Sequence, residues 1–341
     1  MAFEGNTWYT YLIYSLIVTI AIVGNSLVLY IYFTKPRYLK HSYNVFICNL
    51  AVTDTITAIF LIFSRYLYLP SPPPGFSAKD AYCRVIWSAW LPFTLGYVSI
   101  YTCLALTVER WLAVNRPHLY LTLQAKQAVK AVVGVWLVGI LVNITTLFRA
   151  KYNKEKDECM WTTLAVGNDE LPWVDFTLQS IVPFATMIIL YSHIIYTLYR
   201  LKFVVGQQNH PVKKVTGMAL AASLALIVGW LPSRISFLLS KFGYVDPNSL
   251  LHFCLIMLAF MNISINPFLY GIYCSQFRED YKSICLGVVK RLSWIQPSEA
   301  KARDIEMQGR VNKGMIDPND ETVITIKRSS LGSKIGYKVG R

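Results

Sequence analysis

Residues 249–277 read SLLHFCLIMLAFMNISINPFLYGIYCSQF and contain no Asp, Glu, Lys or Arg. A helix of about 20 apolar residues crosses the hydrocarbon core of a bilayer. This run is too long for a strand in a protein core, and it lacks the ~10-residue alternation of a membrane β-barrel strand. We therefore expect a membrane-spanning helix.

Six further runs have the same character, and Asp54 is the one charged residue inside them. Because backbone groups in lipid must be satisfied internally, all seven runs should be helices. The chain of 341 residues is 54% hydrophobic and 15% charged, whereas a soluble domain is about a quarter charged. The sequence thus excludes a soluble enzyme and a disordered chain, and predicts an all-α membrane protein with a seven-transmembrane helix bundle. The other six runs are residues 10–33, 45–64, 85–108, 131–148, 176–199 and 215–233.

Lys and Arg predict how the chain lies in the membrane. They concentrate after the first, third and fifth spans and in the tail, and cytoplasmic loops are rich in these residues. The net charge of +14 therefore indicates topology and contact with anionic lipid rather than a nucleic-acid partner. We expect a multi-pass plasma-membrane protein with its N-terminus outside and no cleaved signal peptide. The expected parts are an extracellular N-terminus (1–9), the bundle (10–273), a short amphipathic eighth helix (274–286) and a disordered cytoplasmic tail (287–341).

Asp54 lies near the middle of the second span. A charge in this position is costly and usually functional. One interpretation is a protonated carboxyl that only joins helices by hydrogen bonds. The other is a carboxylate that holds a cation together with hydroxyl and amide groups of Asn25, Ser99, Asn262 and Asn266.

Two outer cysteines allow a single pairing. Cys83 begins the third span, and Cys159 lies in the long loop after the fourth. The extracellular side is oxidising, so we predict a Cys83–Cys159 disulfide. The remaining cysteines lie in spans or on the inner side, where thiols stay reduced.

Several motifs follow the spans in a fixed order, and together they resemble the rhodopsin-like (class A) G-protein-coupled receptors, of the peptide-receptor type, over residues 10–285. The prolines predict helix kinks, and Glu109-Arg110 taken alone could be only an anchor at the membrane boundary. The matching residues are Gly24-Asn25, Leu50 to Asp54, Glu109-Arg110-Trp111, Pro117, Trp136, Pro183, Tyr191, Trp230-Leu231-Pro232, Asn266-Pro267-Phe268-Leu269-Tyr270 and Phe277-Arg278.

The resemblance implies a receptor, not an enzyme, that activates heterotrimeric G proteins. It implies that Arg110 pairs with Glu109 at rest and meets the G protein when the sixth span swings outward, and that Trp230 relays ligand occupancy. Kinases and arrestin would act on the tail, and Cys285 would be palmitoylated and bind membrane lipid. The implied switch residues are Glu109, Arg110, Tyr191, Asn266, Pro267 and Tyr270; the implied allosteric sodium and water site is Asp54, Ser99, Asn262 and Asn266, with no other cofactor.

Some residues depart from the pattern of that family. Leu226 stands where a Phe is common, and Val212 stands where some members carry an acid that locks Arg110. Cys83 is two residues farther from Arg110 than usual, with Pro92 between them. We expect a helix distortion there that absorbs the extra residues.

The charges of the outer half bear on the ligand. The third span has no acid for an amine ligand, and the seventh has no Lys for retinal. Arg65 and Arg234 predict a basic pocket for a carboxylate, phosphate or acidic peptide. The alternative is that Arg65 reaches the surface and Arg234 pairs with Asp175 or Asp246. The predicted pocket comprises Arg65, Tyr66, Trp87, Trp90, Tyr97, Trp230, Arg234, Phe237 and Phe260.

The loop that ends in Glu158-Cys159-Met160-Trp161 resembles the β-hairpin lid of peptide receptors. We therefore favour a neuropeptide-like ligand. A small anionic or lipid-acid ligand, a constitutively active receptor and a seven-helix transporter that uses Asp54 as proton carrier are the alternatives.

Overall fold

The computed structural model describes residues 8–65, 74–162, 170–205, 210–247 and 249–287, with side chains described over 11–62, 74–162, 170–200, 213–247 and 249–287. Outside these residues lie Tyr66, the side chains of Arg65 and Val212, and the tail for which we made predictions. Residues 1–282 form one compact unit and residues 283–341 a second.

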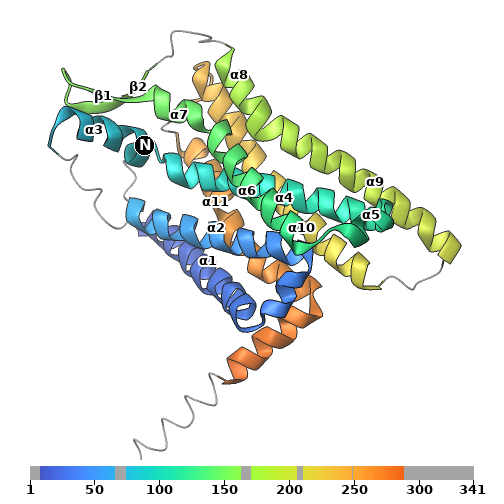
Figure 1. The fold of residues 1–341 in the computed structure, drawn as a ribbon. Helices are drawn as coiled ribbons and strands as arrows, with labels where there is room; N and C mark the ends of the chain where they lie inside the picture. Colours follow the sequence, from blue (N-terminus) through green and yellow to red (C-terminus); the bar gives the residue numbers. More distant parts are fainter. Residues whose placement is uncertain (1–7, 66–73, 163–169, 206–209, 248, 288–341) are drawn as a thin grey trace, which may run out of the picture. The chain divides into compact units, whose positions relative to one another are not determined.

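Seven long helices are apolar enough to cross a membrane, which confirms the predicted seven-span bundle (Figure 1). α4 contacts α2, α6, α9 and α10 and is therefore the central helix. α10 packs on α11, and α1 packs on α2 and α11. The long helices are α1 (Trp8–Thr34), α2 (Ser42–Arg65), α4 (Trp90–Asn115), α6 (Ala125–Val142), α9 (Val182–Val205), α10 (His210–Lys241) and α11 (Leu250–Tyr273).

Short elements connect the long helices. A two-stranded antiparallel sheet of β1 (Ala150–Asn153) and β2 (Glu158–Trp161) pairs Tyr152 with Cys159, which confirms the predicted hairpin. We call the two ends of the bundle the hairpin end, where β1 and β2 lie, and the α5 end, where α5 lies. The other short elements are η1 (Pro36–Lys40), α3 (Phe76–Tyr82), η2 (Cys83–Trp87), α5 (Pro117–Thr122), α7 (Ile144–Arg149), α8 (Leu171–Phe176) and η3 (Thr177–Ile181).

The third span is interrupted, as its extra residues predict. The π-helical turn η2 (Cys83–Trp87) is followed by Ala89, whose φ of 53° is left-handed. A π turn holds more residues than an α turn, so these residues fit without shifting the rest of α4. Pro92 lies after the break, in the first turn of α4, where a missing N–H removes no helical hydrogen bond.

Asn25 and Pro267 explain the contact between α1 and α11. Pro267 lacks an N–H, so the carbonyl of Ile263, four residues earlier, loses its helical donor. The Asn25 side chain donates to that carbonyl oxygen at 2.9 Å. Gly24 permits this approach, since a Cβ there would lie 2.7 Å from Pro267 Cγ.

The apolar run of residues 249–277 extends past the end of the seventh span. α11 stops at Tyr273 rather than Phe277 because Cys274 is extended, with φ −107° and ψ 108°. A further helix covers residues 275–287. Phe277 is buried against Tyr32 and Tyr270, with ring centroids 5.7 and 5.8 Å apart.

Candidate functional site

The hairpin is fastened to the bundle by covalent and ionic contacts. Cys83 in η2 and Cys159 in β2 form a disulfide with a Cα–Cα distance of 5.4 Å, which confirms the predicted pairing. Lys79 Nζ lies 2.5 Å from a carboxylate oxygen of Asp157. The hydrogen bond from Lys79, together with one from Tyr152, lowers the pKa of Asp157. The hairpin is therefore held over its end of the bundle.

A cavity lies beside this hairpin, between α4, α7, α8 and α10. Tyr97, Arg234 and Phe237 line it, as predicted. Its water-accessible space is about 40 Å³, which holds a few water molecules. The lining also includes residues that sequence reasoning did not single out as pocket residues: Asn143, Arg149, Trp161, Asp175, Gln179 and Lys241.

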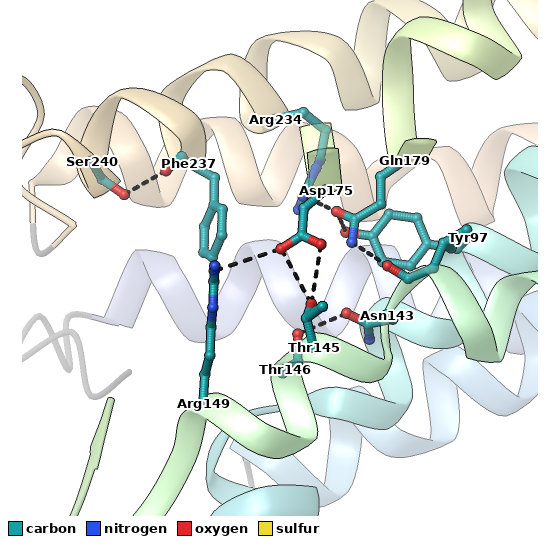
Figure 2. Close-up of polar contacts among 11 residues, drawn as sticks. Tyr97, Asn143, Thr145, Thr146, Arg149, Asp175, Gln179, Arg234, Phe237 and Ser240 are labelled. Atoms are coloured by element: carbon teal, nitrogen blue, oxygen red, sulfur yellow. Dashed lines mark hydrogen bonds and ion pairs between the residues drawn. The ribbon is translucent and has the colours of Figure 1, made fainter. Parts of the chain in front are cut away.

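Arg234 is the most deeply buried cation of this cavity, with 6% of its surface exposed. Its guanidinium donates to Gln179 Oε1, which also accepts a 2.8 Å hydrogen bond from the Tyr97 hydroxyl (Figure 2). The guanidinium carbon lies 5.3 Å from the ring centroid of Tyr97 and 5.1 Å from that of Phe237. Two aromatic faces and an amide therefore surround this charge.

Asp175 is not the partner of Arg234, which one interpretation of the sequence proposed. It accepts hydrogen bonds of 3.2 Å from the Thr145 hydroxyl and lies 3.6 Å from Arg149 Nη1 (Figure 2). The hydrogen-bond partner of Arg234 is Gln179 instead, because Gln179 faces α10 from the buried side of η3. Asp175 therefore pairs with Arg149 and not with Arg234, contrary to the alternative interpretation of the sequence.

Four other predicted pocket residues, Trp87, Trp90, Trp230 and Phe260, lie near the cavity but not in its wall. Trp87 packs on Trp161 with ring centroids 5.2 Å apart, and Trp90 Nε1 donates to the Asn143 carbonyl at 3.1 Å. Trp230 and Phe260 form a layer below Tyr97: the Trp230 ring lies 5.9 Å from Tyr97 and 6.3 Å from Phe260. Trp230 is therefore placed directly under the cavity.

A second polar cluster surrounds Asp54, which is fully buried. Asn266 Nδ2 donates to its carboxylate at 2.8 Å, and Ser99 Oγ lies 3.5 Å away. The buried Asn262 Oδ1 has no hydrogen-bond partner among the described residues. The Asp54 carboxylate and the Ser99 hydroxyl are oxygen donors of the kind that a hard cation such as sodium prefers.

At the α5 end, Arg110 is held from three sides. Arg110 Nη2 donates to Glu109 Oε1 at 2.5 Å and to the Tyr120 hydroxyl at 3.0 Å. Its guanidinium carbon lies 4.9 Å from the ring centroid of Tyr43 and 5.5 Å from that of Tyr120. Glu109 also accepts a 2.6 Å hydrogen bond from the Ser42 hydroxyl. The Glu109–Arg110 pair implied by the resemblance is present, and two tyrosines add to it.

Further predicted switch residues lie between the two ends. Tyr191 and Ser223 join α9 to α10 through a 3.3 Å hydroxyl contact. The buried Tyr270 hydroxyl has no hydrogen-bond partner in the described part of the chain.

Next to the α5 end, Lys35 bonds to Asp280, and this hydrogen bond raises the pKa of the Lys35 ammonium. Cys285 is exposed on the helix over residues 275–287.

Comparison with known families agrees with this arrangement. The family described as 7 transmembrane receptor (rhodopsin family) matches residues 24–270, a stretch that begins at Gly24 and ends at Tyr270. Proteins of this family are multi-pass receptors of the plasma membrane, not enzymes, and they take an extracellular ligand and couple to G proteins. The chain therefore belongs to the rhodopsin family of seven-transmembrane, G-protein-coupled receptors.

Proposed function

We propose that this receptor binds its ligand in the cavity beside the hairpin and that the hairpin end is extracellular. The observation that carries the proposal is the cavity itself. A disulfide-anchored hairpin lies beside it, Tyr97 is part of its wall, and Trp230 lies beneath Tyr97. A disulfide persists in the oxidising extracellular space. The Lys and Arg distribution favours the same orientation.

The ligand that we favour is a peptide. A β-hairpin beside a cavity gives an extended chain both backbone partners and side-chain pockets. The aromatic walls Tyr97, Phe237 and Trp161 suit apolar side chains. A small anionic or lipid-acid ligand is the second candidate, and the three cations of the cavity favour it specifically.

Signal transfer would follow the buried contacts between the two ends. Ligand in the cavity shifts Tyr97 and with it Trp230, since their rings are in contact. The Asp54 cluster links α2, α4 and α11 below that layer. Sodium held by Asp54, Ser99, Asn262 and Asn266 would neutralise the buried carboxylate and favour the resting state.

At the α5 end, G-protein binding would require Arg110 to leave Tyr43 and Tyr120. Ligand and G protein would then bias the same two-state equilibrium, and each would strengthen the binding of the other. Receptor kinases and arrestin are the proposed partners of the tail, and the exposed Cys285 is the proposed palmitoylation site.

Nucleotide exchange in membranes tests the proposed function. Membranes that carry the full chain are screened with a peptide library and a lipid-acid library for GTP-analogue binding to G proteins. We expect one ligand to stimulate exchange in the native receptor and to lose this effect in a surface-expressed Arg110→Ala variant that still binds it. Ion flux without nucleotide exchange under any condition would contradict the proposal.

A further inference from the structure

The ligand cavity has an excess of positive charge. Among the residues that the structure describes, Arg149, Arg234 and Lys241 line it against one carboxylate, Asp175. Arg234 and Lys241 are seven residues apart on α10, about two helical turns, and so lie on one face. Lys241 Nζ lies 4.7 Å from the ring centroid of Phe237 and 5.2 Å from that of Trp161. Phe237 thus contacts two cations at once.

The single carboxylate is already engaged. Asp175 takes two hydrogen-bond contacts from Thr145 and pairs with Arg149 (Figure 2). It lies within electrostatic range of Arg234 and Lys241 as well. One negative charge cannot neutralise three positive ones, so two positive charges remain in excess at this wall.

The Arg234 guanidinium has a nitrogen that lacks a hydrogen-bond acceptor among the described residues. Its Nε is buried and has no hydrogen-bond partner in the described part of the chain. Gln179 supplies only a neutral amide oxygen to the guanidinium, and its own Nε2 is fixed by a 2.6 Å hydrogen bond to the Val142 carbonyl. A buried charge without an ionic partner is costly. A ligand acid that replaces water beside Arg234 would remove that cost.

We propose that the cavity binds a carboxylate of the ligand, with Arg234 as its main contact and Arg149 and Lys241 as supporting charges. This inference rests on the proposed function, since it takes the cavity as the ligand site. A planar carboxylate matches the guanidinium fork, and its small size suits the narrow space. The rings of Tyr97, Phe237 and Trp161 require an apolar or aromatic group next to the acid.

Such a carboxylate has two sources, a peptide and a small acid, and matched probes separate them. The full chain is purified into lipid nanodiscs at low salt, and its thermal unfolding is followed with increasing probe. One pair of probes is N-acetyl-tryptophan and N-acetyl-tryptophanamide, which stand for the end of a peptide. The other pair is decanoate and decanamide, which stand for a lipid acid.

We expect one acid to raise the unfolding temperature and its neutral amide not to. Arg234→Gln should raise the half-saturating concentration of that acid at least tenfold. Arg234→Lys, which keeps the charge, should recover part of the loss and shows that the fold is intact. Lys154→Gln removes an exposed cation from the hairpin turn and should change nothing. A response to the tryptophan acid indicates a peptide, and a response to decanoate indicates a lipid acid.

The carboxylate site is refuted if acid and amide act alike, if neither acid acts, or if Arg234→Gln responds as the native chain does. The readout needs no G protein. Acid binding without nucleotide exchange would therefore contradict the proposed function alone. Agonist-driven exchange whose potency is unchanged in Arg234→Gln would contradict the carboxylate site alone.

Discussion

Gly96 in α4 packs against Trp230 below the cavity, and Gly96→Ala should destabilise the receptor. A Cβ at this position would lie 2.2 Å from Cη2 and 2.4 Å from Cζ2 of Trp230. Ordinary contact begins near 3.4 Å, so the methyl group and the indole would have to separate by about 1.2 Å. Trp230 is buried between Tyr97 and Phe260 and cannot turn away freely.

The expected cost follows from overpacking, which destabilises cores by about 1–3 kcal/mol. Gly134→Ala in α6 is the matched control, because no atom outside the local helix backbone lies within 4 Å of the added methyl group in the described part of the chain. Alanine favours a helix over glycine by about 1 kcal/mol, so this control should be neutral or stabilising. Thermal unfolding in nanodiscs, followed by tryptophan fluorescence, compares the two. Equal unfolding temperatures for Gly96→Ala and Gly134→Ala would refute the reasoning.

Three further predictions concern other contacts. Sodium chloride should stabilise the native receptor against heat more than choline chloride does, and Asp54→Asn should abolish the difference; a difference that persists in the variant would exclude the sodium site. Tyr120→Phe removes the hydroxyl that binds Arg110 and should raise basal nucleotide exchange; unchanged exchange at equal surface expression would show that this contact does not restrain Arg110. Cys83→Ser opens a disulfide that spans 76 residues and should cost up to about 4.5 kcal/mol; native-like unfolding temperatures would show that the Lys79–Asp157 ion pair and hydrogen bonds suffice to hold the hairpin.

Much of the fold could be predicted because a bilayer imposes strict demands on a sequence. A long uncharged run has few alternatives to a membrane-spanning helix. The extra residues before α4 likewise indicated a helix distortion. Helix ends were less predictable. The bundle limit at residue 273 agrees with the end of α11, but the end of α6 at Val142 was not predicted because the apolar residues continue into α7.

The cavity was predicted less completely than the fold. Arg234, Tyr97 and Phe237 were found because a charge or a ring in the outer half of a span is conspicuous. Gln179 is also a polar residue inside a span, and this signal could have identified it. Arg149 and Lys241 end their helices and look like ordinary boundary charges in the sequence. Only the packing of α7 and α8 near α10 shows that they face the same cavity as Asp175.

If ligand acts as proposed, the cavity and the α5 end belong to one two-state system. The direct test measures the affinity of an agonist found in the exchange screen, in nanodiscs, with and without nucleotide-free G protein. Linked sites require tighter binding with the G protein present, by a factor of about 5–150 for typical coupling energies. Addition of GTP should reverse this gain. Equal agonist affinity in both states would contradict the account.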